Sequence, residues 1–95
     1  MNVQHRESAD RFVVRLDDKL AYLSYERPKD GVLDYAHVFV PEEHRGAGIA
    51  AELTKTALEY AKEKGIKVIP SCPYVVTYLK RHPEYDDIIV DAYEV

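Results

Sequence analysis

Residues 38–50 read Val-Phe-Val-Pro-Glu-Glu-His-Arg-Gly-Ala-Gly-Ile-Ala, and they contain the change from a strand pattern to a helix pattern. Its first three residues suit a β-strand, which Pro41 ends because proline has no N–H to donate to a strand ladder. Two glycines follow. Apolar residues then recur at helical spacing from residue 50 to residue 61. The stretch is therefore predicted to be a strand, a glycine-bearing loop and the first turn of a helix.

The loop between this strand and this helix has the properties of an anion site. N–H groups in the first turn of a helix lack an intrahelical partner and carry a partial positive charge. Gly46 and Gly48 allow the backbone to approach a ligand and to adopt a positive φ, and Arg45 adds a fixed charge. Phosphate or pyrophosphate is the natural occupant. The alternative is a tight turn that binds nothing.

Two well-known phosphate motifs do not match this loop. No Gly-Lys-Ser/Thr follows it, so it is not a P-loop. The dinucleotide fingerprint would end in glycine, where this chain has Ala51, and a doubly wound fold needs a longer chain.

The flanking segments complete a single mixed α/β domain. Strand patterns fall on residues 11–16, 19–27, 32–40, 66–72 and 88–90. Helical patterns fall on about 48–64 and 74–81, with Gly65 as a C-terminal cap. Residues 1–8 are polar and are predicted to be a frayed lead-in. The order β-β-β-α-β-α-(β) predicts a mixed sheet in which a helix links one parallel strand pair.

Composition limits the classes of protein to which the chain can belong. Its 95 residues allow one domain, covering 1–95, and its 13 basic and 17 acidic residues give a net charge of −4. That charge disfavours nucleic acid or an anionic membrane as a partner, although it does not exclude a local patch of basic residues. No apolar run approaches the roughly 20 residues of a membrane span. The lone Cys72 permits no intramolecular disulfide, which favours a reducing, cytoplasmic location.

Residues 45–50, Arg-Gly-Ala-Gly-Ile-Ala, resemble the acetyl-CoA pyrophosphate loop of the GCN5-related N-acetyltransferases. That family's pattern is Gln or Arg, two residues, Gly, one residue, then Gly or Ala, and Arg45, Gly48 and Ala50 match it. The chain most resembles the very small YjdJ-type branch, over about residues 34–83. The similarity includes His37 and the Pro-Ser-Cys run at 70–72, but Val38 stands where relatives often carry Thr.

The resemblance implies a minimal acyl-CoA N-acyltransferase fold and transfer of an acetyl group from acetyl-CoA to a primary amine, including an amine on a protein. The third and fourth strands would splay apart around the thioester, with Cys72 and His37 near the acetyl group as candidate catalytic residues. The pantetheine arm would pair with the backbone of Phe39 and Val40. Backbone N–H groups would hold the pyrophosphate at Arg45, Gly46, Ala47, Gly48, Ile49 and Ala50.

Each candidate side chain keeps a structural alternative. Cys72 is an inert buried thiol, part of the pocket wall, or a nucleophile that needs a lowered pKa. His37 is a hydrogen-bonded strand histidine or the base that deprotonates the acceptor. Tyr74 and Tyr78 pack on a helix or protonate the leaving thiolate. The four histidines and Cys72 do not have metal-ligand spacing, so no metal is expected.

Two rival functions remain open. The chain is either a module that binds CoA or acyl-CoA without turnover, or an interaction domain in which the glycine loop is only a turn. Compared with usual members of the superfamily, it lacks room for the two helices that follow the first strand, which implies an open acceptor face. The expected partners are acetyl-CoA and an amine acceptor, with neither nucleic acid nor membrane. An exposed strand edge is compatible with a monomer or a weak dimer.

Overall fold

The computed structural model describes residues 1–91 and contains one five-stranded sheet, whose strands lie side by side in chain order. The strands are β1 (Gln4–Arg6), β2 (Arg11–Leu16), β3 (Lys19–Lys29), β4 (Val32–Phe39) and β5 (Lys67–Ile69). The helices are α1 (Ile49–Lys64) and α2 (Pro73–Arg81), with 3-10 segments at Glu7–Ala9, Glu42–His44 and Pro83–Ile88. β1 to β4 pair antiparallel, and β5 joins β4 in parallel after α1. The predicted mixed α/β fold is confirmed.

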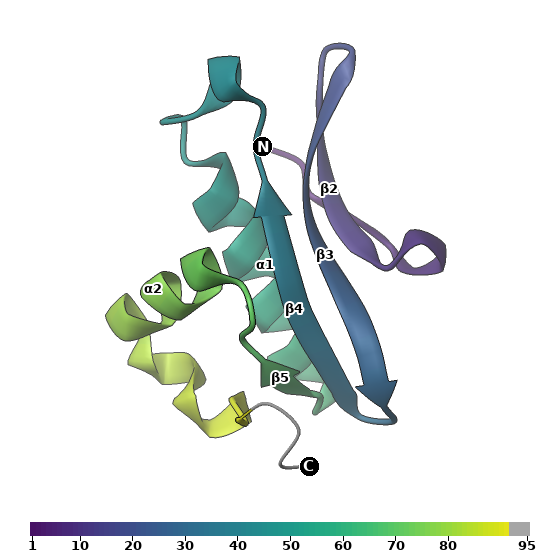
Figure 1. Cartoon of the computed structure of the whole chain (residues 1–95), viewed down its shortest axis with the longest axis vertical. Coiled ribbons are helices and arrows are strands. Elements are labelled where there is room, and N and C mark those ends of the chain that lie inside the picture. Colours follow the sequence, from purple (N-terminus) through teal and green to yellow (C-terminus); the bar gives the residue numbers. More distant parts are fainter. Residues whose placement is uncertain (92–95) are drawn as a thin grey trace.

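The core lies between one face of the sheet and the helices. Alternation along β3 sends Ala21, Leu23 and Tyr25 to that face, where all three are buried. α1 lies behind the sheet in Figure 1, and the hydroxyl of Tyr35 donates to the carbonyl of Ala57 at 2.5 Å. Leu53, Ala57, Leu58 and Ala61 of α1 lie in the core, as their spacing predicted, but Ile49 takes the place expected for Ala50, which is only partly buried. On α2 the core residues are Val75 and Leu79.

Glycines mark both ends of α1. Gly48 precedes its first turn with φ +83°, and Gly65 follows its last turn with φ +71°. The N–H of Gly65 donates back to the carbonyls of Ala61 and Lys62, which closes the helix end. Both bounds agree with the prediction.

A β-bulge changes which residues of β4 face the core. Tyr25 pairs with Tyr35 and Ser24 pairs with His37, so Ala36 is an extra residue on β4. Before the bulge, Leu33 and Tyr35 belong to the core, and after it Val38 and Val40 pack against the core. His37 and Phe39 therefore lie on the opposite face of the sheet, which we call the outer face.

The prediction of a frayed lead-in at residues 1–8 is wrong. Residues 4–6 form β1, in which Gln4 pairs with Val13 and Arg6 with Arg11. The His5 ring stacks on Phe12 with 4.0 Å between centroids, and its Nε2 lies 2.7 Å from the hydroxyl of Tyr25. These contacts with buried aromatic rings hold a polar segment that has little strand propensity of its own.

The last two predicted strands are shorter than expected. β5 ends at Ile69, before Pro70, rather than continuing to residue 72. A 3-10 helix extends through Ile88, so only an isolated parallel bridge between Ile89 and Val68 remains of the strand at 88–90. The N–H of Val90 donates to the carbonyl of Val68 at 2.9 Å. Within residues 1–91, neither helix has the length and apolar content needed to cross a bilayer.

Candidate functional site

β4 and β5 are paired over only part of β4. Their register joins residues 32–34 to residues 67–69, and the N–H of Cys72 then donates to the carbonyl of Tyr35 at 3.0 Å. Beyond Tyr35, β4 has no strand partner on this side within the part of the chain that the structure describes. The rest of that edge is therefore available to a ligand that can pair with backbone groups.

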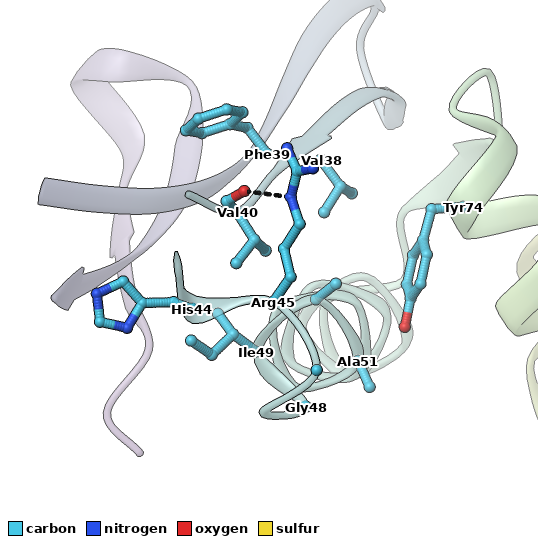
Figure 2. A pocket seen from close by; sticks show the side chains of 11 residues that line it. Val38, Phe39, Val40, His44, Arg45, Gly48, Ile49, Ala51 and Tyr74 are labelled. Carbon is cyan, nitrogen blue, oxygen red and sulfur yellow. Dashed lines mark hydrogen bonds between the residues drawn. The ribbon is translucent and has the colours of Figure 1, made fainter. Parts of the chain in front are cut away.

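A pocket of about 440 Å³ lies at this end of β4. Its wall combines the end of the strand, the glycine loop, the first turn of α1 and the start of α2 (Figure 2). The residues that line it are Val38, Phe39, Val40, His44, Arg45, Gly46, Gly48, Ile49, Ala50, Ala51 and Tyr74.

The loop presents a continuous run of free backbone donors. Across residues 46–51, no backbone N–H donates to another backbone group of residues 1–91, and the first bond of α1 runs from Glu52 to Gly48. Gly46 and Gly48 have φ of +88° and +83°, a conformation that strains residues with a side chain. Free N–H groups at a helix N-terminus favour an anion.

Arg45 contributes its side chain rather than its backbone. Its N–H donates to the carbonyl of Glu42 at 3.2 Å, so that group is already used. Its Nε donates to the carbonyl of Val40 at 3.0 Å, which folds the guanidinium back over the end of β4 (Figure 2). This leaves the terminal guanidinium nitrogens, which suit a phosphate oxygen.

Tyr74 and Tyr78, the two tyrosines of α2, have different surroundings. Tyr74 lines the pocket, and in Figure 2 its ring stands on the α2 side with the hydroxyl toward α1. Desolvation raises the pKa of this phenol, so it stays protonated at neutral pH. Tyr78 instead stacks on His82 with 3.9 Å between ring centroids.

Cys72 and His37 do not line the pocket, and the structure does not bring them together. Cys72 is 5% exposed and belongs to the core cluster, immediately before α2. His37 is exposed on the outer face, and its ring centroid lies 6.2 Å from that of Tyr22. A reacting group between the strands would therefore have the thiol on its core side and the imidazole on its outer side.

The residues predicted to bind the cofactor, unlike Cys72 and His37, lie together around the pocket. Seven of the eight predicted cofactor residues line the pocket, and Ala47 is the exception. The predicted set did not include Val38, His44, Ala51 and Tyr74. Ala51 could have been found from its place in the first helical turn, three residues after Gly48. Among residues 1–91, no three potential metal ligands lie together.

Comparisons with known proteins agree with this architecture. The model of the family described as GCN5-related N-acetyl-transferase matches residues 11–88. "Protein NATD1" from Homo sapiens is 35% identical over 85 residues, which cover 87% of this chain and 75% of that protein. The Danio rerio protein of that name is 34% identical over 90 residues, covering 90% and 81%. A GCN5-like protein from Staphylococcus aureus, solved by NMR, shares the fold with a TM-score of 0.74 at 24% identity, covering 98% and 91%.

Proposed function

Because the chain belongs to the GCN5-related N-acetyltransferase family, we propose that it transfers the acetyl group of acetyl-CoA to a primary amine. The observation that carries this proposal is the run of free N–H groups at residues 46–51, beside a pocket that continues along β4. Pyrophosphate is the part of acetyl-CoA that suits the run of donors. The unpaired edge of β4 suits the amides of the pantetheine arm.

Acetyl-CoA would be held by charge at one end and by backbone pairing at the other. The pyrophosphate accepts from the loop N–H groups and from the guanidinium of Arg45, whose charge is fixed. The pantetheine amides pair with the backbone of Phe39 and Val40. The carbonyl of Val40 already accepts from Arg45 Nε at 3.0 Å, so a ligand amide on that oxygen would share it with Arg45 or displace it.

Transfer would proceed by direct attack. The neutral amine nitrogen bonds to the thioester carbonyl carbon, the carbon–sulfur bond breaks, and the CoA thiolate takes a proton. The new amide nitrogen releases its surplus proton, which returns through water to the group that protonated the thiolate. Tyr74 supplies the thiolate's proton because its phenol lines the pocket and, with a raised pKa, remains protonated at neutral pH. His37 accepts the proton of the incoming ammonium through water, from its exposed position on the outer face.

An acetyl-Cys72 intermediate is the secondary route. It would need a thiolate that acetyl-CoA can reach, but Cys72 is 5% exposed within the apolar core. Its burial keeps acetyl-CoA away from the sulfur, so we place direct transfer first.

Binding without turnover is the second candidate. It is favoured by the positions of Cys72 and His37, because neither lines the pocket that the loop builds. A chain of this kind would retain acetyl-CoA through Arg45 and the glycine loop and would sense it or present it to a partner. Under either candidate we expect a cytoplasmic monomer or weak dimer, in keeping with a free, buried cysteine.

Incubation with acetyl-CoA and two kinds of peptide tests the proposal. One kind offers a lysine and the other a free N-terminus, and both CoA thiol release and peptide mass are measured. We expect thiol release that depends on the peptide and the addition of one acetyl group to it. Binding of acetyl-CoA without peptide acetylation would support the second candidate, and no binding would refute both.

A further inference from the structure

The outer face of the sheet carries a row of basic residues. Residues directly opposite each other in antiparallel strands point to the same face, so the register defines the rows. One row runs across four strands as Arg6, Arg11, Ser24 and His37. The next row, toward the pocket, is Gln4, Val13, Tyr22 and Phe39, and Arg15 lies beyond it on β2.

The three arginines of this face have no ionic partner among residues 1–91. The ion pairs there join Lys19 to Glu43, Arg27 to Asp10 and His82 to Glu84. On the outer face, Glu26 and the largely buried Asp34 lie opposite each other, nearer the turn between β3 and β4. Asp17 and Asp18 line a hollow together with Arg15. A chain with a net charge of −4 thus carries, on β1 and β2 of its outer face, three arginines without an ionic partner among the described residues.

Arg11 in particular is poised for an anion. Its guanidinium carbon lies 4.3 Å from the centroid of the Tyr22 ring, which is a cation–π contact on the outer face. Its Nε is buried and has no hydrogen-bond partner within the described chain. Burial hides this nitrogen from a ligand in solvent, so a carboxylate would pair with the terminal nitrogens of the guanidinium.

Aromatic contacts connect this basic row to the pocket. The ring centroid of Tyr22 lies 5.5 Å from that of Phe39 and 6.2 Å from that of His37. Phe39 also lines the pocket and is 37% exposed. A ligand on the outer face therefore reaches the pocket without crossing a helix.

We propose that this face docks an acidic polypeptide segment that carries the acceptor amine. The inference rests on the proposed function and names the class of acceptor. Carboxylates on the segment pair with Arg6, Arg11 and Arg15, and the amine reaches the thioester past His37. A short acidic segment can keep its carboxylates beside the arginines of β1 and β2, whereas a nucleic acid that continued along the sheet would also carry phosphates past Glu26.

Matched peptides and matched variants test the proposal. One fluorescent peptide has a lysine flanked by glutamates, and in the other glutamines replace the glutamates. The test variant is Arg6→Gln/Arg11→Gln/Arg15→Gln. The control is Lys55→Gln/Lys62→Gln/Lys64→Gln, which removes the same charge from exposed positions on α1. Binding is measured by fluorescence anisotropy at low and high salt, and acetylation by peptide mass.

We expect the unaltered chain and the lysine variant to bind the glutamate peptide about tenfold more tightly than the glutamine peptide at low salt. This preference should shrink as the salt concentration rises. The arginine variant should lose this preference and keep its affinity for acetyl-CoA, measured by calorimetry. Equal binding of the two peptides, or equal loss in both variants, would overturn the inference. Tighter binding of single-stranded DNA of matched charge, or salt-sensitive self-association that requires the arginines, would also overturn it.

Failure of the proposed function gives a different result. If the chain binds acetyl-CoA and acetylates both peptides equally well, the acceptor assignment fails and the acetyltransferase stands. If calorimetry detects no acetyl-CoA binding to the unaltered chain, the proposed function fails first, and the outer face loses its assignment as an acceptor surface.

Discussion

The backbone N–H of Cys72 donates to the carbonyl oxygen of Tyr35 at 3.0 Å, one residue beyond the pairing of Asp34 with Ile69. This bond lies where β4 and β5 separate, and it places the start of α2 beside the open edge of β4. It brings Tyr74 to the pocket and leaves the Cys72 thiol in the core. The loop after β5 therefore assigns different surroundings to two candidate side chains that are two residues apart.

Replacing Cys72 tests whether its thiol takes part in the reaction. For Cys72→Ala we expect turnover within a few-fold of the unaltered chain, because direct attack uses no protein nucleophile. The loss of a buried sulfur should lower the free energy of unfolding by about 1 kcal/mol. Steady-state kinetics and the mass of the intact protein after incubation with acetyl-CoA check this. Abolished turnover, together with an acetyl adduct on Cys72 in the unaltered chain, would favour the covalent route.

Tyr74→Phe removes the proposed proton donor and preserves the ring. We expect kcat to fall by about 100-fold, within the usual range for a general acid, with little change in acetyl-CoA affinity. Tyr78→Phe is the matched control, because Tyr78 packs on His82 outside the pocket lining. Equal effects of the two substitutions would argue that Tyr74 only packs.

The pH profile gives a second measure of Tyr74. The phenol must be protonated to donate, and desolvation raises its pKa above the ordinary value of about 10. Activity should therefore fall on the basic side only at a pH above about 10, and Tyr74→Phe should lack this limb. Rates of thiol release across the alkaline range, in protein shown to be folded by circular dichroism, provide the check.

The buried position of His5 should make the stability of the folded chain depend on pH. Burial lowers its pKa below the ordinary value of about 6.5, so the unfolded chain takes up a proton more readily than the folded one. Stability should therefore fall as the pH drops through about 6.5, until the folded state also binds the proton. His5→Phe keeps a ring against Phe12, and its Tm should fall less between about pH 7 and pH 5. If Tm falls equally with pH in the unaltered chain and in His5→Phe, then His5 does not cause the pH dependence.

Tyr35 ties the sheet to α1 through its bond to the carbonyl of Ala57. Tyr35→Phe should lower the free energy of unfolding by about 1 kcal/mol and the Tm by roughly 4–8 °C. Tyr22→Phe is the control, since Tyr22 lies on the outer face and its hydroxyl has no hydrogen bond to residues 1–91. Thermal unfolding followed by circular dichroism compares the two, and equal shifts would show that the bond contributes nothing.

Local sequence signals predicted most of this fold. The alternation in β3, the helical spacing in α1 and the two glycines at its ends are local patterns, and each one agrees with the structure. β1 could not be predicted in this way, because its stability comes from the contacts of His5 with rings far along the chain. The bulge at Ala36 likewise depends on how β3 and β4 align.

In the site, too, the features that follow from local sequence were predicted, and those that depend on distant contacts were not. Strand, loop and helix are contiguous in sequence, so the spacing of residues 38–50 predicted most of the pocket lining. The sequence placed His37 and Cys72 near one reacting group, but their side chains lie on different sides of the sheet. Which side each takes depends on the bulge and on the loop after β5, and neither has a clear local signal.

Calorimetric titration with acetyl-CoA tests whether the loop at residues 46–51 holds the pyrophosphate. The unaltered chain is compared with Gly48→Trp and with Gly65→Trp, because both glycines have positive φ and open space around the missing side chain, at opposite ends of α1. We expect the unaltered chain and Gly65→Trp to bind acetyl-CoA, and Gly48→Trp to fold without binding it. Binding that survives in Gly48→Trp, or no binding to the unaltered chain, would contradict it.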